Sequence, residues 1–289
     1  LSVFKGRVDI GYLAAIVAAA NAGGSGSVVG DTTTTMMWIA GVSPQQVFHA
    51  YGAAIPALLV FGVICSIKQQ RYQAIQKEEI GHHTVEWKNL AAVVLILVGA
   101  ITANFALDFP AVGVWTAILL AAIFCKTPWS EAARSLKGTV FLLALVGCAS
   151  MMPVDELPDA SAVTAVGLGA LSAVCDNLPL TKLAIDQNGY DWGMLAYTVG
   201  FGGSIVWFGS SAGVALTNQF PHGCSVGAWI KHGWSVALAY VVGFAVLYAT
   251  LGWHPELIET ESPAPTHTAP KNLSEMPGPL PSHPDATTH

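Results

Sequence analysis

The chain has 289 residues, of which 53% are hydrophobic and 10% are charged, and its mean hydropathy is +0.54. Soluble domains usually carry about 25% charged residues, so this composition excludes an ordinary soluble domain and indicates a chain that lies in a lipid bilayer. The net charge of −6 comes without a basic stripe, which argues against nucleic acid as a partner, and the scattered cysteines form no CxxC pair for a metal or disulfide site.

Long apolar segments predict membrane-spanning helices, because a span needs about 20 mainly apolar residues. Two segments are interrupted by glycine, and the arms of a third, around CDNLPL, are each too short to cross, so this third segment is predicted to be a re-entrant hairpin. In chain order we expect a broken helix at 10–39, spans at 47–67, 89–107, 111–125 and 133–152, the hairpin at 161–189, a second broken helix at 192–220 and a span at 226–251. The predicted fold class is an all-α polytopic membrane protein.

Positive charge predicts the orientation of these spans. The loop 68–88 carries four Lys or Arg residues and the region around 126–137 carries three more, whereas the alternate loops carry only acidic residues. We therefore expect 68–88 to be a cytoplasmic loop and the hairpin to enter from outside. The proline-rich tail 254–289 has no apolar periodicity and is expected to be disordered.

The two broken helices share a glycine–serine pattern. GGSGSVVG (Gly23–Gly30) and GGSIVWFG (Gly202–Gly209) each begin Gly-Gly-Ser and place the next glycine at the same distance. Because the orientation runs them in opposite directions, they predict the inverted repeat of a secondary transporter, with 1–67 ending the first copy and 89–253 forming the second. The offset between the hairpin turn and Gly202, applied to Gly23, falls before Leu1. The first repeat is therefore expected to be incomplete and the chain to be the C-terminal part of a longer protein.

Polar residues at these breaks indicate an ion site. Glycines allow a helix to stop and leave backbone groups facing a cavity; the expected break residues are Gly23, Gly24, Gly30, Gly202, Gly203 and Gly209. An aspartate at bilayer depth costs about 2.5–3.5 kcal/mol on insertion scales, and carboxylate, amide and hydroxyl oxygens suit a hard cation. The candidate ion-binding residues are Asn21, Asp31, Thr32, Thr33, Asp176, Asn177, Ser204, Ser210 and Ser211.

Simpler structural roles remain open for the same residues. Asp31 precedes a run of threonines and is a good helix N-cap, while Asp176 and Asn177 are common turn residues. Serine and threonine also hold membrane helices together. Lys182 either reaches outward to the membrane surface or pairs with Asp176. The enzyme motif HExxH and a nucleotide-binding loop are missing from the sequence, so we expect a protein that is not an enzyme.

At these residues the chain resembles the NhaD-type sodium/proton antiporters, within a superfamily that includes citrate, dicarboxylate and arsenite carriers. The resemblance covers Leu1 to about Trp253 and rests on NAGGSGSVVGDTTT (Asn21–Thr34), DNLPL (Asp176–Leu180) and GFGGSIVWFGSSAGVA (Gly200–Ala215). It implies a multi-pass carrier, often a homodimer in the bilayer, whose two hairpins and two broken helices enclose the ion, without a cofactor. The chain departs from the family in lacking the first hairpin, which carries a further Asp-Asn motif.

Three transport functions follow from this pattern. The leading one is exchange of Na⁺ or Li⁺ for H⁺, in which one carboxylate binds either a cation or a proton and so couples the two fluxes. The second is sodium-coupled transport of an organic anion such as citrate or a dicarboxylate, although two buried aspartates would repel an anion. An arsenite or other oxyanion carrier is the third. We expect the protein in the inner membrane of a bacterium.

Overall fold

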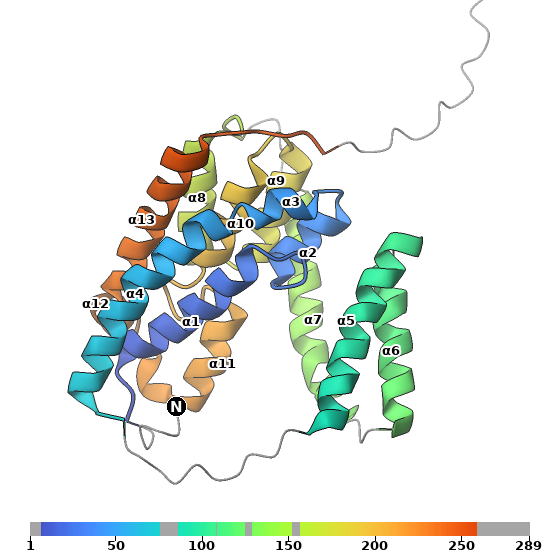
Figure 1. Cartoon of the computed structure of the whole chain (residues 1–289), viewed down its shortest axis with the longest axis horizontal. Coiled ribbons are helices and arrows are strands. Elements are labelled where there is room, and N and C mark those ends of the chain that lie inside the picture. The colour runs from blue at the N-terminus through green and yellow to red at the C-terminus, as the bar shows by residue number, and fades with distance from the viewer. Residues whose placement is uncertain (1–6, 76–85, 108, 125–128, 152–156, 259–289) are drawn as a thin grey trace, which may run out of the picture. The chain divides into compact units, whose positions relative to one another are not determined.

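The structure is a computed structural model that describes residues 7–75, 86–107, 109–124, 129–151 and 157–258. Within these ranges the chain forms helices and no strand, which confirms the all-α prediction (Figure 1). The first half holds α1 (Ile10–Ser25), α2 (Thr32–Ile39), α3 (Pro44–Phe48), α4 (Tyr51–Tyr72), α5 (Trp87–Leu107) and α6 (Pro110–Phe124). The second half holds α7 (Trp129–Ser150), α8 (Ala162–Ser172), α9 (Asn177–Gln187), α10 (Trp192–Gly202), α11 (Ser211–Gln219), a 3₁₀ turn (Pro221–Gly223), α12 (Val226–His232) and α13 (Trp234–Leu251).

Among the described residues, three helical segments are long and apolar enough to cross a membrane, namely α3 with α4, α5 and α13. The segments expected at 47–67, 89–107, 111–125 and 133–152 fall on α4, α5, α6 and α7, with residues 125 and 152 outside the described ranges. The continuous span expected at 226–251 is instead divided into α12 and α13 at Gly233. A Cβ there would lie 2.7 Å from the Trp229 carbonyl oxygen, so the chain turns where only glycine fits.

Both glycine-rich segments are interrupted helices. Gly23, Gly24 and Gly202 lie in the last turns of α1 and α10, and the interruptions themselves run over 26–31 and 203–210. In the first, a Cβ at Gly24 would lie 2.7 Å from the Gly30 carbonyl oxygen. In the second, a Cβ at Gly203 would lie 2.6 Å from the Gly209 carbonyl oxygen. In each interruption two glycines therefore pack tightly against each other. A larger residue at either position would fit only if the backbone moved.

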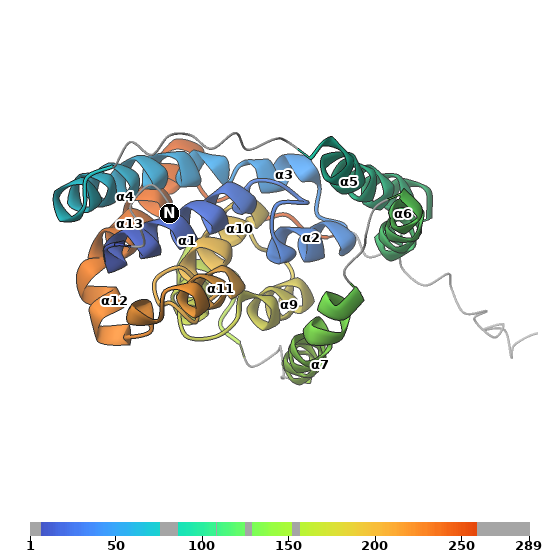
Figure 2. The ribbon, with the colours of Figure 1, turned by 90° about the horizontal axis from the view of Figure 1, so that it is seen from below.

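The segment predicted to be a hairpin contains two short helices, α8 and α9, joined by residues 173–176. Ser161 caps α8 and Asp176 caps α9 by accepting backbone N–H bonds. The turn touches the second interruption, since a Cβ at Gly209 would lie 2.6 Å from the Ala173 carbonyl oxygen. Helix α9, which follows this turn, packs against α2 (Figure 2). The turn and the start of α9 thus lie close to both interruptions.

Helix α10 is the centre of the packed core. All eleven of its residues are buried, and it contacts α1, α4, α8 and α13. The ring of Tyr197 stacks on Tyr240 of α13 at a centroid distance of 6.0 Å, and its hydroxyl donates to the Ala239 carbonyl oxygen at 3.2 Å. Such a fully packed helix is a rigid support for the residues at its C-terminal end.

Helices α5 and α6 pack on each other through glycine. A Cβ at Gly99 would lie 2.8 Å from the Gly113 carbonyl oxygen, so the two backbones approach closely. Many of their other side chains are apolar and exposed, including Val93, Leu119 and Phe124. Helices that are apolar all round are typical of membrane spans.

The beginning of the C-terminal tail differs from the expectation of disorder from residue 254. Residues 252–258 run across the ends of α9 and α10, where Trp192 Nε1 donates to the Glu256 carbonyl oxygen at 2.8 Å. The Asn188 amide pairs with both backbone groups of Ile258, at 2.9 and 3.2 Å. The indole of Trp192 and the amide of Asn188, which come much earlier in the chain, therefore fix the position of residues 252–258. The rest of the tail lies outside the described residues, as do residues 76–85 of the expected loop 68–88. Residues 68–72 of that loop belong instead to the last turns of α4.

Replacing Gly169 by alanine tests how the hairpin is seated on α10. A Cβ at Gly169 would lie 2.5 Å from the Thr198 carbonyl oxygen, whereas a Cβ at Gly167 meets nothing within 4 Å. Gly169→Ala is expected to cost about 1–3 kcal/mol through overpacking, and Gly167→Ala to cost nothing or to stabilise slightly. Apparent unfolding midpoints of the purified variants in detergent measure the difference. Equal midpoints would contradict this packing.

Candidate functional site

Asp31 lies where α1, α2, α9 and α10 come together. Its carboxylate caps α2, with Oδ1 accepting from the Thr32 N–H at 2.8 Å and from the Thr32 hydroxyl at 3.3 Å. Asn177 Nδ2, from the first residue of α9, donates to Oδ2 at 3.4 Å. A Cβ at Gly200 of α10 would lie 3.5 Å from the same oxygen. The structure therefore brings Asp31 and Asn177 together, although they are far apart in the sequence.

Asp176, the residue before Asn177, supplies a second carboxylate in this region. It is half-buried, caps α9 by accepting from the Leu178 N–H at 3.0 Å, and interacts electrostatically with Asp31. Two ionised carboxylates at this range repel, and a bound cation or a proton relieves that repulsion. Lys182 does not supply the compensating charge, because it pairs with Asp186 within α9.

The hydroxyls of the threonine run differ in what they bond. Thr34 Oγ1 donates to the Ser27 carbonyl oxygen at 2.6 Å and Thr35 Oγ1 to that of Val28 at 2.9 Å, so these two fasten the interruption to α2. Thr33 is fully buried, and its hydroxyl interacts with the Asp31 carboxylate without the geometry of a full hydrogen bond. A buried polar atom that lacks a good hydrogen bond costs about 1–3 kcal/mol. The Thr33 oxygen is thus a poorly satisfied polar group beside Asp31.

The second interruption contributes buried hydroxyls. Asn21 Nδ2 of α1 donates to Ser204 Oγ at 2.9 Å, and both side chains are buried. Ser210 is buried and caps α11 by accepting from the Gly213 N–H at 3.4 Å. Ser211 and Thr32 are exposed. The indole Nε1 of Trp207 is buried without a partner, which makes it a free donor that sequence reasoning did not single out.

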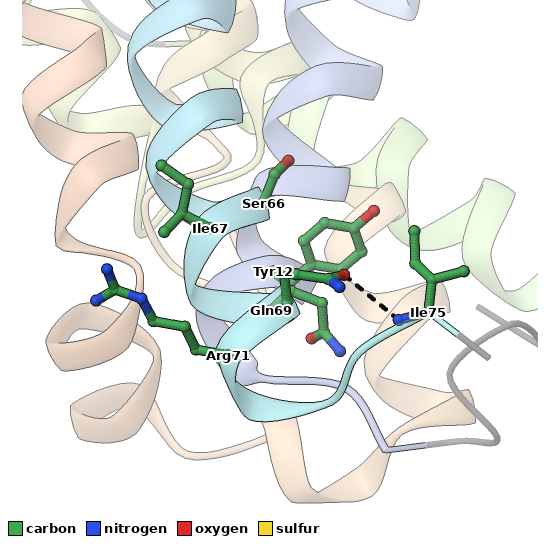
Figure 3. Close-up of a pocket in the computed structure, with 7 residues that line it drawn as sticks. Tyr12, Ser66, Ile67, Gln69, Arg71 and Ile75 are labelled. Atoms are coloured by element: carbon green, nitrogen blue, oxygen red, sulfur yellow. Dashed lines mark hydrogen bonds between the residues drawn. The ribbon is translucent and has the colours of Figure 1, made fainter.

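A cavity of about 470 Å³ lies elsewhere, near the opposite end of α1 (Figure 3). Tyr12, Ser66, Gln69 and Arg71 are among its lining residues, and the Ile75 N–H donates to Gln70 Oε1 at 3.4 Å beside it. Tyr12 precedes Asn21 by nine residues, or roughly 14 Å along a helix. The cavity is therefore separate from the residues around Asp31.

Comparison with known proteins identifies two curated relatives. The Na⁺/H⁺ antiporter NhaD of Halomonas elongata is 26% identical over 286 aligned positions, covering 80% of this chain and 57% of the relative. Sodium/proton antiporter 1 of Arabidopsis thaliana is 25% identical over 245 positions, covering 70% of this chain and 42% of the relative. The search found no matching protein-family model and no matching solved structure.

These relatives confirm the resemblance to NhaD-type sodium/proton antiporters on which the motifs converged. Both are named as transporters rather than enzymes, and with the apolar helices they show that the chain is an integral membrane protein. The chain spans about half the length of the curated relatives it matches.

Asn21 and Ser204 are hydrogen-bonded although they lie 183 residues apart in the sequence, so the effects of replacing them on stability should be coupled. Asn21→Ala and Ser204→Ala are each expected to lower the free energy of unfolding by about 1–3 kcal/mol, because each leaves a buried polar partner unpaired. The double variant should lose less than the sum of the two. Ser150→Ala, which removes an exposed hydroxyl bonded only within α7, serves as the control. Strictly additive losses would show that the two side chains do not interact.

Proposed function

We propose that the protein carrying this chain is a secondary active transporter that exchanges Na⁺ or Li⁺ for H⁺. The observation that carries this proposal is the Asp31 carboxylate, which contacts Asn177, the neighbour of a second carboxylate, Asp176, and lies beside a buried hydroxyl, Thr33, that makes no full hydrogen bond. The names of the two relatives support the same function at the level of the family. Na⁺, Li⁺ and H⁺ are the transported substrates, and the mechanism needs no cofactor.

Coupling follows from competition at one group. Asp31 Oδ1 is used by the cap of α2, while Oδ2 makes a long contact with Asn177. A hard cation prefers oxygen ligands, and Oδ2, the Thr33 hydroxyl and the Asp176 carboxylate are the oxygens we assign to it. Because a proton on Asp31 removes the charge that attracts the cation, the site holds one or the other. Exchange results when each is released on a different side of the membrane.

The remaining candidates form the surroundings of this site. We assign Asn21, Ser204 and Ser210 to the wall between the two interruptions, where the Asn21–Ser204 bond joins α1 to the second interruption and Ser210 caps α11. Thr32 and Ser211 are exposed at the first turns of α2 and α11, and we keep them as candidate ligands on the ion's path.

We also propose that the two interrupted helices belong to an inverted repeat and that α8–α9 is a re-entrant hairpin. The matched glycine pairs, Gly24 with Gly30 and Gly203 with Gly209, support a shared architecture of the two interruptions. In carriers built this way the site lies at the repeat interface, and one part of the molecule moves against the other. A homodimer in the inner membrane of a bacterium is the proposed setting.

One observation favours a second function, sodium-coupled transport of an organic anion. The unpaired indole N–H of Trp207 and the N-terminal ends of α2, α9 and α11 are donors that would suit a carboxylate substrate such as citrate. Against this stand two carboxylates at the same place, which would repel the anion. Uptake of radiolabelled citrate by the wild-type protein would favour this second function.

Replacing Asp31 by asparagine tests the leading proposal. Asparagine keeps an oxygen to accept the Thr32 N–H but cannot exchange a proton, so Asp31→Asn in the complete protein should fold and insert yet abolish Na⁺-dependent proton movement in proteoliposomes. Asp176→Asn is expected to do the same, because it removes the second charge. Asp186→Asn, which removes a carboxylate paired with Lys182 in the same hairpin, is the matched control and should retain antiport. Near wild-type antiport in Asp31→Asn would return this residue to a capping role.

A further inference from the structure

The two broken helices, α1 to α2 and α10 to α11, contact each other crosswise. Aligned on their glycines, as Gly23 on Gly202, the first broken helix places Asn21 at the position that Gly200 holds in the second, and Ser25 at that of Ser204. Asn21 bonds to Ser204 at 2.9 Å. The reciprocal pair is also in contact, since a Cβ at Gly200 would lie 3.7 Å from Ser25 Cβ. The contact between Asn21 and Ser204 is therefore matched by a contact between the equivalent residues, Gly200 and Ser25, with the roles of the two broken helices exchanged.

The side chains in these two contacts are different. On one side Asn21 fills the space next to Ser204 and closes it with a hydrogen bond. On the other side Gly200 has no side chain, and the group next to it is Asp31 Oδ2, 3.5 Å from where a Cβ would be. The N-cap residues at equivalent positions also differ, because Asp31 of α2 carries a carboxylate and Ser210 of α11 carries a neutral hydroxyl. Charge and free space thus occur together on the Asp31 side.

We propose that Gly200 is a specificity-determining residue, which keeps the space beside Asp31 Oδ2 wide enough for Na⁺ as well as Li⁺. The proposal rests on the cation site of the proposed function. A carbon atom 3.5 Å from an oxygen is in van der Waals contact with it, so even one methyl group at this position occupies that side of the oxygen. The buried α10 backbone beneath it cannot retreat, because every residue of α10 is packed. The loss of space should then weaken the binding of Na⁺, the larger cation, more than the binding of Li⁺.

Gly200→Ala tests this inference without endangering the fold. The new methyl group meets nothing closer than 3.5 Å, and alanine is favoured over glycine in a helix by about 1 kcal/mol, so the variant should be at least as stable as the wild type. The matched control is Gly147→Ala, inside α7, where a Cβ meets nothing within 4 Å. In proteoliposomes of the complete protein we expect Gly200→Ala to raise the KM for Na⁺ about tenfold and that for Li⁺ clearly less, and Gly147→Ala to change neither.

Ion binding without transport separates the failure of this inference from the failure of antiport. The unfolding midpoint of the purified protein is measured in NaCl, LiCl or choline chloride at equal ionic strength. The wild type should be stabilised by both Na⁺ and Li⁺, and Gly200→Ala by Li⁺ more than by Na⁺. This pattern without any proton exchange in the wild type would refute antiport and leave the role of Gly200 standing. Equal responses of wild type and Gly200→Ala, a uniform loss for both ions, or a wild type that neither ion stabilises would each overturn the inference.

Discussion

A helix that stops inside a bilayer leaves backbone N–H and C=O groups that only the protein itself can satisfy. In this chain the partners are short polar side chains next to the interruptions. Asp31 and Ser210 accept the first N–H groups of α2 and α11, while Thr34 and Thr35 donate to carbonyl oxygens inside the first interruption. The polar residues that make a cation site possible are therefore the same residues that make the interrupted fold possible.

Asp31 shows how one side chain serves both purposes. A cap needs only one acceptor atom, and a carboxylate has two, so capping α2 through Oδ1 leaves Oδ2 facing α9 and α10. The buried α10 fixes one wall of that space, and the glycine contacts of α8 with α10 fix the position of the hairpin turn with its second carboxylate, Asp176. The proposed chemistry thus falls on a single oxygen atom, Asp31 Oδ2, whose surroundings are set by packing.

The sequence predicted the elements better than the contacts between them. Glycine spacing and apolar length located both interruptions and the two arms of the hairpin, because these depend on local backbone freedom and on the length of each apolar run. The pairing of Asn21 with Ser204 and the approach of Gly200 to Asp31 depend on tertiary packing, which the local sequence around each residue does not encode. For the same reason the division of 226–251 at Gly233 was missed, as was the fixed stretch before Ile258, which amide and indole groups far back in the chain hold in place.

The central claim, that Na⁺ and H⁺ compete for the carboxylate of Asp31, is tested most directly by the pH dependence of the KM for Na⁺. The complete protein would be assayed in proteoliposomes from pH 6 to 9. Below the pKa of the competing carboxyl group, each further pH unit down should raise the apparent KM by up to about tenfold, equivalent to about 1.4 kcal/mol, because Na⁺ must displace a proton. Above that pKa the KM should become constant. A KM for Na⁺ that stays flat across the whole range would contradict competition at one carboxylate, even if Na⁺ transport itself were observed.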